Sequence, residues 1–251
     1  MLLTVTLLQT NTIWGDPHAN MARAEALIAQ TSGSDLYVLP EMWATGFATT
    51  PMEVPTDDEP VSWMQSMAQR CGAAICGSLA VRLADGSYRN RHYMALPDGT
   101  LHHYDKHHLF TYGHEDEYFT PGNSNTIVNY RGVSILLLTC YDLRFPLWAR
   151  YGRAGHYDLI VCVANWPESR QQAWRILTRA RAIENQCFLV GVNRVGDDAF
   201  CHYRGESLVC DSRGETLAEC APNQEQAITV ALDLDRQQHA RQRFRVLDDR
   251  D

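Results

Sequence analysis

Lysine is almost absent from this chain of 251 residues, whose 22 basic residues are one lysine, Lys106, and 21 arginines. An arginine carries a broad, rigid guanidinium, whereas a lysine carries a compact ammonium on a flexible stem. A compact ammonium suits the stabilisation of one developing oxyanion, so the position that kept lysine is a candidate for chemistry. The alternative is that Lys106 is a surface lysine retained by chance. The residues that accompany Lys106 decide between these two interpretations.

Long apolar runs and an excess of positive charge are also missing. No stretch approaches the roughly 20 apolar residues of a membrane-spanning helix, so we expect no membrane partner. The formal net charge of −8 disfavours a nucleic-acid partner, because binding to phosphates requires clustered positive charge. The apolar run at residues 2–8 has no basic segment before it and no small-residue cleavage site after it, which predicts a first strand rather than a signal peptide.

Redox motifs are missing as well. The eight cysteines include no C-x-x-C pair, which disfavours a thiol-based redox protein. Several of them, such as Cys76, Cys162 and Cys187, stand inside apolar runs, where a free thiol behaves as a small hydrophobic side chain. We therefore expect a reduced, cytoplasmic protein.

Strand-like apolar runs alternate with amphipathic stretches, which predicts an α/β layered fold. The expected strands occupy residues 3–8, 36–39, 73–79, 88–96, 101–104, 133–139, 159–164, 188–193, 207–211, 216–220 and 227–232. The first expected helix begins at Pro17 and is closed by Gly33. Three further helices are expected at residues 61–71, 146–154 and 169–185, and residues 110–125 are expected to form a loop over a site. We predict one domain over residues 1–233, followed by a charged, helical tail over residues 234–251.

Three polar residues occupy equivalent places in this pattern, since Glu41, Lys106 and Cys140 each stand at the end of a strand-like run. Side chains at the carboxyl ends of strands converge on one crevice. A carboxylate, an ammonium and a thiol are therefore expected to meet there. Cys140 stands in a transition from strand to helix, where helix N-terminal amides and Lys106 are expected to lower the pKa of its thiol.

The motifs around these residues resemble the nitrilase superfamily of carbon-nitrogen hydrolases. The matching segments, in the family's order, are LPEMWATGF (39–47), YDKHHLF (104–110), EDEYFTPG (115–122), LLTCYDLRFP (137–146), VANWP (163–167) and RARAIENQCFLVGVNRVG (179–196). The resemblance is closest to the Nit-type omega-amidases, which include the bacterial YafV group. True nitrilases carry Trp-Glu-Asn after the nucleophile, whereas this chain carries Tyr-Asp-Leu at residues 141–143, which disfavours nitriles as substrates.

The resemblance implies a four-layer αββα sandwich, a homodimer, no metal and no organic cofactor. It also assigns the catalytic roles: Glu41 as general base, Lys106 as oxyanion stabiliser, Cys140 as nucleophile and Glu115 as the second carboxylate that holds Lys106. A thiol activated by a base attacks an amide carbonyl and gives a thioester. The backbone N–H of Tyr141 is the second expected donor to the oxyanion. The alternative for Glu115 is a solvated acidic loop, because two further acidic residues follow it.

The expected substrate-binding residues are Tyr141, Arg144 and Trp166. Arg144 is a candidate to bind a substrate carboxylate through two parallel hydrogen bonds from its guanidinium. It could equally hold Asp142 or another acid in the helix. Trp166 is expected to wall the pocket together with Trp43, Phe47 and Tyr112, while the alternative is that these aromatic rings belong to the core. The histidines His102, His103, His107, His108 and His114 invite a metal interpretation, but adjacent histidines on a strand point to opposite faces and cannot converge on one ion.

The expected function is an amidohydrolase that cleaves the terminal amide of a small carboxylated substrate and releases ammonia. The resemblance names alpha-keto acid amides, such as alpha-ketoglutaramate and alpha-ketosuccinamate. Two alternatives use the same chemistry, namely a deaminated glutathione amidase and a carbamoyl hydrolase. A third alternative, from another class, is a catalytically silent binding protein, which the intact set of Glu41, Lys106 and Cys140 disfavours.

Overall fold

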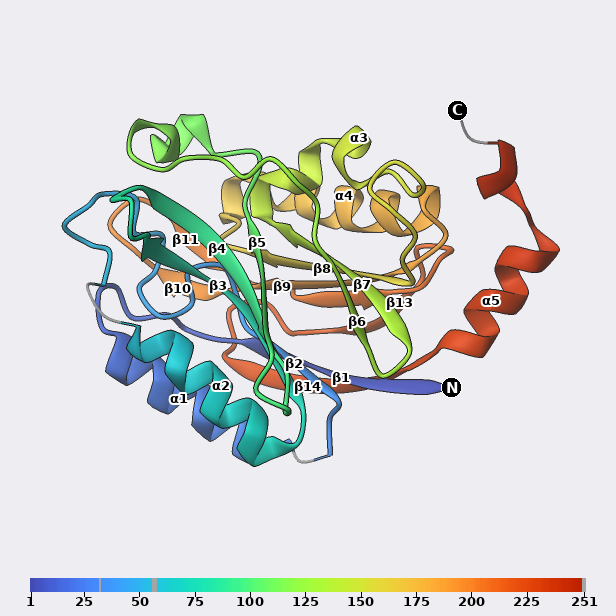
Figure 1. Cartoon of the computed structure of the whole chain (residues 1–251), viewed down its shortest axis with the longest axis horizontal. Coiled ribbons are helices and arrows are strands. Elements are labelled where there is room, and N and C mark those ends of the chain that lie inside the picture. Colours follow the sequence, from blue (N-terminus) through green and yellow to red (C-terminus); the bar gives the residue numbers. More distant parts are fainter. Residues whose placement is uncertain (32, 56–57, 250–251) are drawn as a thin grey trace.

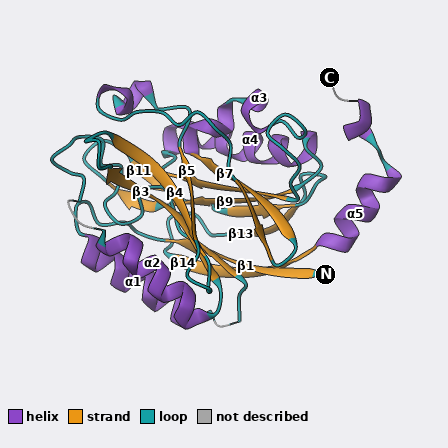
Figure 2. Cartoon of the chain, viewed as in Figure 1, coloured by secondary structure: helices purple, strands orange, loops and turns teal. Residues whose placement is uncertain are grey.

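Two six-stranded sheets pack face to face between two layers of helices (Figures 1 and 2). The computed structural model describes residues 1–31, 33–55 and 58–249. Helices α1 and α2 cover the outer face of one sheet, and helices α3 and α4 cover the outer face of the other. The architecture is the expected αββα sandwich. No helix within the described ranges is long and apolar enough to cross a bilayer.

The first sheet has the strand order β14-β1-β2-β3-β4-β5, in which only the β1–β2 and β2–β3 pairs are parallel. Its strands are β1 (Leu2–Gln9), β2 (Leu36–Val38), β3 (Ala74–Arg82), β4 (Tyr88–Ala95), β5 (Leu101–Asp105) and β14 (Gln226–Asp233). Its helices are α1 (Pro17–Ala29) and α2 (Glu59–Cys71). Helix α1 begins as expected, because the Asp16 side chain accepts a hydrogen bond from the N–H of Ala19 and Pro17 takes the first turn.

The second sheet has the order β13-β12-β9-β8-β7-β6, with β7, β8 and β9 mutually parallel. Its strands are β6 (Ile127–Tyr130), β7 (Val133–Thr139), β8 (Leu159–Ala164), β9 (Phe188–Asn193), β12 (Leu208–Cys210) and β13 (Thr216–Glu219). Its helices are α3 (Pro146–Ala149) and α4 (Gln171–Glu184). The parallel strands β7, β8 and β9 are almost continuously apolar because they are buried on both faces.

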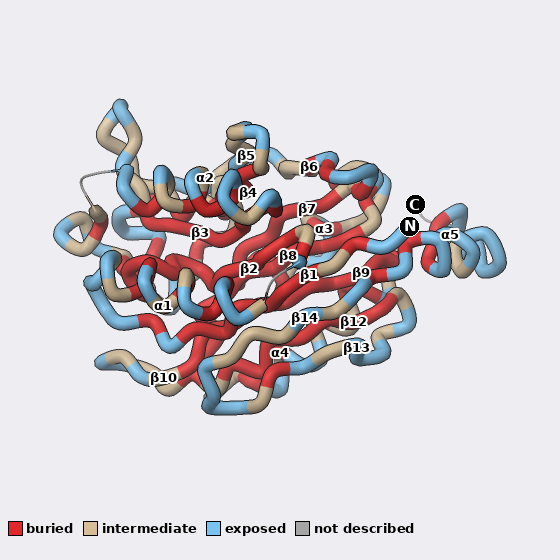
Figure 3. The backbone as a smooth tube through the Cα atoms, turned by 90° about the horizontal axis from the view of Figure 1, so that it is seen from below, coloured by how far each residue is buried: buried red, intermediate tan, exposed pale blue. Residues whose placement is uncertain are grey.

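The two sheets share one core between their inner faces. Alternate residues of β1 and β7, such as Leu3, Val5, Ile135 and Leu137, lie in the same buried cluster. Figure 3 shows that the buried backbone is concentrated in the strands, while exposed residues follow the loops and the outer helix faces. This packing brings the ends of β2, β5, β7 and β8 toward one side of the sandwich.

Several predicted elements differ in extent from the structure. The predicted helix at residues 146–154 ends at Ala149, because the chain then turns through Gly152 and Gly155, which both have positive φ. Helix α4 starts later than expected, after the short turn η4 (Glu168–Arg170). Three short strands had not been expected: β6, β10 (Val195–Asp197) and β11 (His202–Arg204), of which the last two form a separate hairpin.

The expected loop over the site contains two single turns, η1 (Thr111–Gly113) and η2 (Glu115–Glu117). The tail forms helix α5 (Leu234–Arg243) and the turn η5 (Val246–Asp249), and it projects from the body of the sandwich (Figure 1). The family segment around Cys140 is not the start of a long helix, as it forms the separate turn η3 (Cys140–Arg144).

Candidate active site

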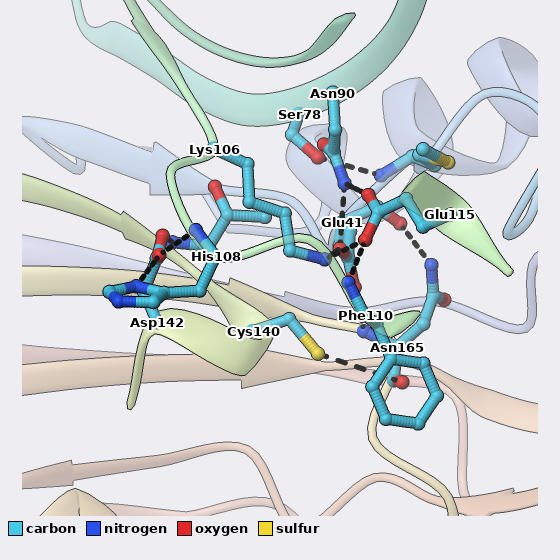
Figure 4. A network of polar contacts seen from close by, with 12 residues as sticks. Glu41, Ser78, Asn90, Lys106, His108, Phe110, Glu115, Cys140, Asp142 and Asn165 are labelled. Carbon is cyan, nitrogen blue, oxygen red and sulfur yellow. Dashed lines mark hydrogen bonds and ion pairs between the residues drawn. The ribbon is translucent and has the colours of Figure 1, made fainter. Parts of the chain in front are cut away.

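Lys106 lies between two carboxylates at the centre of the site (Figure 4). Its Nζ is 2.8 Å from Glu41 Oε1 and 2.8 Å from Glu115 Oε2. All three side chains are fully buried. Glu41 follows β2, Lys106 follows β5, and Glu115 opens the turn η2, so three distant segments meet in one ion cluster. The alternative of a solvated acidic loop does not hold for Glu115, since the acidic neighbours Asp116 and Glu117 are exposed while Glu115 is buried.

Further donors orient the two carboxylates. Asn90 on β4 donates from Nδ2 to Glu41 Oε1 at 2.8 Å and to Glu115 Oε1 at 2.9 Å. The N–H of Asn165 donates to Glu41 Oε2 at 2.8 Å, and the N–H of Phe110 donates to Glu115 Oε2 at 2.7 Å. All four carboxylate oxygens therefore accept at least one hydrogen bond, which offsets the cost of burying two charges.

The electrostatic balance keeps Lys106 charged. Burial alone lowers the pKa of a lysine, but Glu115 and Glu41 outweigh it, so the pKa of Lys106 is raised above its usual value. Burial also raises the pKa of Glu115, and the Glu41 charge acts in the same direction, while Lys106 opposes both. The cluster thus presents a permanent ammonium in a site that excludes water.

Cys140 stands at the end of β7 in a left-handed backbone conformation with φ of 47°. Its Sγ lies 3.8 Å from the Asn165 carbonyl oxygen, to which it donates. Met42 and His114, which are the neighbours of Glu41 and Glu115, also have positive φ, at 42° and 57°. Such conformations are uncommon for residues other than glycine and tend to occur at functional sites. Unusual backbone conformations therefore occur at Cys140 itself and beside two of the other three predicted catalytic residues.

The thiol of Cys140 corrects one expectation. We predicted that helix amides and Lys106 lower its pKa, but burial raises the pKa of Cys140 well above the usual value. The Glu41 carboxylate adds to this effect, and the Lys106 charge opposes it without balancing it. The residues after Cys140 form a single short turn instead of the expected start of a longer helix. The thiol is therefore neutral at rest and needs a base to become a nucleophile.

Asp142 connects the segment of Lys106 to the segment of Cys140. Its carboxylate accepts from the N–H of Thr139 at 3.1 Å and from Tyr104 Oη at 2.7 Å. It also accepts from the backbone N–H of His108 at 2.9 Å, and His108 Nδ1 lies 2.9 Å from the same oxygen. One buried carboxylate thereby fixes both the strand end before Cys140 and the chain that follows Lys106.

A cavity of about 1130 Å³ opens beside this cluster. Its lining includes Cys140 and Asn165, and all three predicted substrate-binding residues, Tyr141, Arg144 and Trp166. The guanidinium carbon of Arg144 lies 4.8 Å from the centroid of the Trp166 ring. Since the Asp142 carboxylate is bound by other donors, Arg144 does not hold Asp142, and the guanidinium faces the cavity.

The predicted aromatic wall is partly correct. Phe47 and Tyr112 line the cavity, and the Lys106 ammonium lies 5.5 Å from the Phe47 ring centroid. Trp43 was assigned wrongly, because it is buried in the cluster between the first sheet and helices α1 and α2. There its ring packs against Trp63, with 4.9 Å between the ring centroids.

Residues 4–242 match the carbon-nitrogen hydrolase family. This chain belongs to that family. It is 42% identical to omega-amidase YafV of Escherichia coli K12, with 99% of this chain and 97% of the relative covered. It is 34% identical to a 2-oxoglutaramate amidase of Bacillus subtilis, with 99% and 98% covered. The predictions of the family and of a hydrolase acting on amide carbon-nitrogen bonds are confirmed.

Solved structures agree with this assignment. A CN-hydrolase superfamily protein of Xanthomonas campestris, which has an arsenic adduct in its active site, superimposes with a TM-score of 0.95 at 39% identity. The match covers 100% of this chain and 98% of that protein. Nit3 of Saccharomyces cerevisiae has the same fold, with a TM-score of 0.86 at 24% identity over 97% and 94% of the two chains. The predicted αββα class is therefore confirmed.

The histidines of this carbon-nitrogen hydrolase have structural partners. The His107 ring stacks on Trp148 and the His108 ring stacks on Phe145, each with 3.7 Å between centroids. His114 lies 2.8 Å from Glu117 at the surface. Among the described residues, no three His, Cys, Asp or Glu side chains are grouped so that they could hold a metal ion.

Sequence reasoning missed Asn90, Asn165 and the clamping role of Asp142 in this hydrolase. Asn90 had a detectable signal, because it is a polar residue at a buried position of a strand, opposite Ala80 in the register. Asn165 follows β8 as Cys140 follows β7, so the strand-end argument applied to it too. Nothing in the sequence separated Asp142 from an ordinary helix-start acid.

Proposed function

We propose that this protein is an omega-amidase, which hydrolyses the terminal amide of a small carboxylated substrate and releases ammonia. The observation that carries the proposal is the ammonium of Lys106, bound by Glu41 and Glu115 at 2.8 Å each, beside a cavity that Cys140 lines. The names of the omega-amidase and 2-oxoglutaramate amidase relatives support the same activity. We assign Cys140 as the nucleophile, Glu41 as the base, Lys106 as the oxyanion stabiliser and Glu115 as the residue that keeps Lys106 charged.

In the proposed reaction, Glu41 removes the thiol proton while Sγ of Cys140 attacks the amide carbonyl carbon. The raised pKa of the thiol makes this proton transfer necessary. The negative oxygen of the tetrahedral intermediate is stabilised by Lys106 and by the N–H of Tyr141, a preorganised contribution of the kind whose loss costs about 100- to 1000-fold in rate. Glu41 then gives its proton to the leaving nitrogen, and ammonia departs.

The second half of the reaction reuses the same groups. Cys140 now carries the acyl group as a thioester, and Glu41 takes a proton from a water molecule that attacks it. The second tetrahedral intermediate collapses to the carboxylic acid, and the proton returns to the thiol. No redox step is involved, and the net reaction consumes one water for each amide.

The position of Arg144 supports the proposed substrate class. Its guanidinium lines the cavity and lies over the Trp166 ring, so that it remains available to a ligand carboxylate. We propose alpha-keto acid amides, such as alpha-ketoglutaramate and alpha-ketosuccinamate, with the keto-acid carboxylate at Arg144. Deaminated glutathione or a carbamoyl compound would be cleaved by the same four catalytic residues, so a substrate panel has to separate these alternatives.

One experiment tests the activity directly. The protein is incubated with a panel of omega-amides, ammonia is quantified, and the peptide that contains Cys140 is weighed by mass spectrometry. We expect ammonia release and an acyl adduct on Cys140 with the keto-acid amides, and neither from the Cys140→Ala protein. Ammonia release without an adduct would contradict the nucleophile, and no release from any amide would favour a silent binding protein.

We also propose a homodimer that packs through the helices of the second sheet. Leu147, Ile176 and Ile183 on α3 and α4 are 65%, 55% and 49% exposed. Among the described residues, α1 and α2 expose no large apolar side chain to a comparable degree. The two outer layers therefore differ, and only one offers apolar area to a second copy. Light scattering should give a dimer mass for the native protein and a lower mass for Ile176→Glu combined with Ile183→Glu.

The reduced state of the protein bears on its location. All eight cysteines are free, and six of them are buried. Because free thiols persist in reducing compartments, we propose that the enzyme acts in the cytoplasm. Fractionation of cells that express the native chain tests this assignment.

A further inference from the structure

The arginines of this chain divide sharply by their partners. Most donate to a carboxylate or to a carbonyl oxygen. Within the described residues, the guanidinium groups without such a partner belong to Arg82, Arg144, Arg153, Arg170, Arg236 and Arg243. Four of these six are exposed, so water solvates them. Arg144 and Arg170 are half-buried, and both line the cavity beside Cys140.

Arg170 is held in place by aromatic rings rather than by an acid. Its guanidinium carbon lies 5.2 Å from the Phe110 ring centroid and 5.6 Å from the Tyr112 ring centroid. Its carbonyl oxygen accepts a hydrogen bond from Trp166 Nε1 at 2.8 Å. Two rings orient the planar group and leave its N–H donors without a protein acceptor.

The acidic residues of the cavity lining do not provide that acceptor. Glu53 accepts from the N–H and the hydroxyl of Thr50. Glu117 lies 2.8 Å from His114 Nδ1, and Asp198 accepts from the Tyr203 hydroxyl at 2.8 Å. Each acid has a local partner, so among the charged side chains of the described cavity lining only the two arginines lack a hydrogen-bonding or ionic partner.

The cavity is also large for the substrate proposed above. Its volume of about 1130 Å³ lies slightly above the range of roughly 300–1000 Å³ that is typical of sites for drug-sized ligands. A five-carbon keto-acid amide with one carboxylate would fill only part of this space and would pair with only one of the two arginines.

We propose that Arg170 is a second carboxylate-binding residue of the substrate pocket, so that the enzyme favours amides that carry two carboxylates. This inference rests on the proposed amidase function and extends its substrate class. Arg144 binds the keto-acid carboxylate. Arg170, whose guanidinium packs on the Phe110 and Tyr112 rings, binds the second carboxylate. The second carboxylate can be attached to either of two parts of the substrate, the amine that departs or the acyl chain.

Binding measurements on the Cys140→Ala protein test the proposal without requiring turnover. Isothermal titration calorimetry compares the N-carboxymethyl and N-methyl derivatives of alpha-ketoglutaramate, which are similar in size and differ by one carboxylate. A third ligand carries its second carboxylate on the acyl chain. We expect at least one dicarboxylate to bind about 10- to 100-fold more tightly than the N-methyl compound, and its identity distinguishes the two positions of the second carboxylate.

Substitution of Arg170 supplies the decisive comparison. In the Cys140→Ala background, Arg170→Gln should bring the ratio of the dissociation constants of the N-methyl compound and the preferred dicarboxylate close to one. Arg170→Lys should retain part of the preference for the dicarboxylate. Arg236→Gln, which removes the same charge from the exposed surface of α5, should leave the ratio unchanged. A ratio that is near one with Arg170 intact, or that survives Arg170→Gln, would overturn the proposal. Failure of the amidase function itself is recognised separately, because unsubstituted alpha-ketoglutaramate would then neither bind nor release ammonia.

Discussion

The two halves of the sandwich contribute different things to the site. Glu41, Asn90 and Lys106 come from the first sheet, whereas Cys140 and Asn165 come from the second. The charged groups of the first half bind one another at 2.8 Å and are fully buried. The thiol of the second half donates to the Asn165 carbonyl oxygen at 3.8 Å and also interacts with the Glu41 carboxylate. The charged groups are therefore held by several short hydrogen bonds, whereas the hydrogen bond of the thiol is longer and weaker.

Several hydrogen bonds join these halves, and two of them connect the segments that carry the predicted catalytic residues. The N–H of Asn165 donates to Glu41, and Asp142, two residues after Cys140, accepts from the N–H of His108, two residues after Lys106. The geometry between the base, the ammonium and the thiol depends on both contacts. We call these two contacts the joint between the halves. Substitutions should therefore separate into those that damage the charged half, those that damage the joint, and those that change only the thiol.

The largest effect is expected from Lys106→Arg, which preserves the charge but not its shape. Nζ lies between two carboxylates with no exposed surface, so a guanidinium cannot take its place without displacing one of them. We expect kcat/KM for a keto-acid amide to fall about 1000-fold, the upper limit for one oxyanion donor. Arg236→Lys is the matched control at the surface. Near-normal turnover of Lys106→Arg would show that any cation suffices and would remove the argument for a compact ammonium.

The joint is tested by Asp142→Asn. An amide of the same shape loses the charge that His108, Thr139 and Tyr104 contact, at a cost of about 1–3 kcal/mol in the free energy of unfolding. We expect kcat to fall about 100-fold with a smaller change in KM, because the thiol and the ammonium lose their mutual alignment while Arg144 still binds substrate. Chemical denaturation and steady-state kinetics measure the two effects. A KM increase with normal kcat would contradict a positioning role.

Glu115→Gln weakens the charged half without removing it. Since Glu115 raises the pKa of Lys106, its loss lowers that pKa, and Lys106 then deprotonates at a lower pH. The alkaline limb of the kcat/KM profile should move toward neutral pH, and the rate at pH 7 should fall roughly 10-fold. Asp116→Asn, the exposed neighbour in the same turn, is the control and should follow the native profile. Full turnover with an unshifted limb in Glu115→Gln would disprove the assignment.

The two halves were also unequally predictable from sequence. Glu41, Lys106 and Cys140 could be placed in one crevice because each ends a strand, and strand ends converge. The joint could not be foreseen, because it depends on which loop atoms meet Asp142 after the sheets have packed. Trp43 was misplaced for the opposite reason: its position beside Glu41 in the sequence suggests a pocket residue, yet the left-handed turn at Met42 directs it into the core.

The fold itself was predictable where period and burial agreed. The strands β7, β8 and β9 have the predicted bounds, since their apolar runs end abruptly at polar or turn residues. The edge strand β6 and the hairpin of β10 and β11 lacked such runs, and their pairing depends on neighbours supplied by tertiary contact. The thiol pKa was mispredicted because sequence reveals nearby charges but not the depth of burial, which is the dominant cause at Cys140.

The smallest effect concerns the influence of the charged half on the thiol. Because burial and Glu41 raise the pKa of Cys140, its alkylation by iodoacetamide should be slow at pH 7 and should still increase above pH 9, where an ordinary cysteine has largely ionised. In Glu41→Gln the repulsion between the carboxylate and a thiolate is gone, so the profile should shift to lower pH even though amide hydrolysis is lost. The alkylation rate, followed by mass spectrometry of the Cys140 peptide between pH 6 and pH 10, measures the shift. An identical profile in both proteins would mean that Glu41 does not act on the sulfur, and the base would then have to be sought elsewhere in the site.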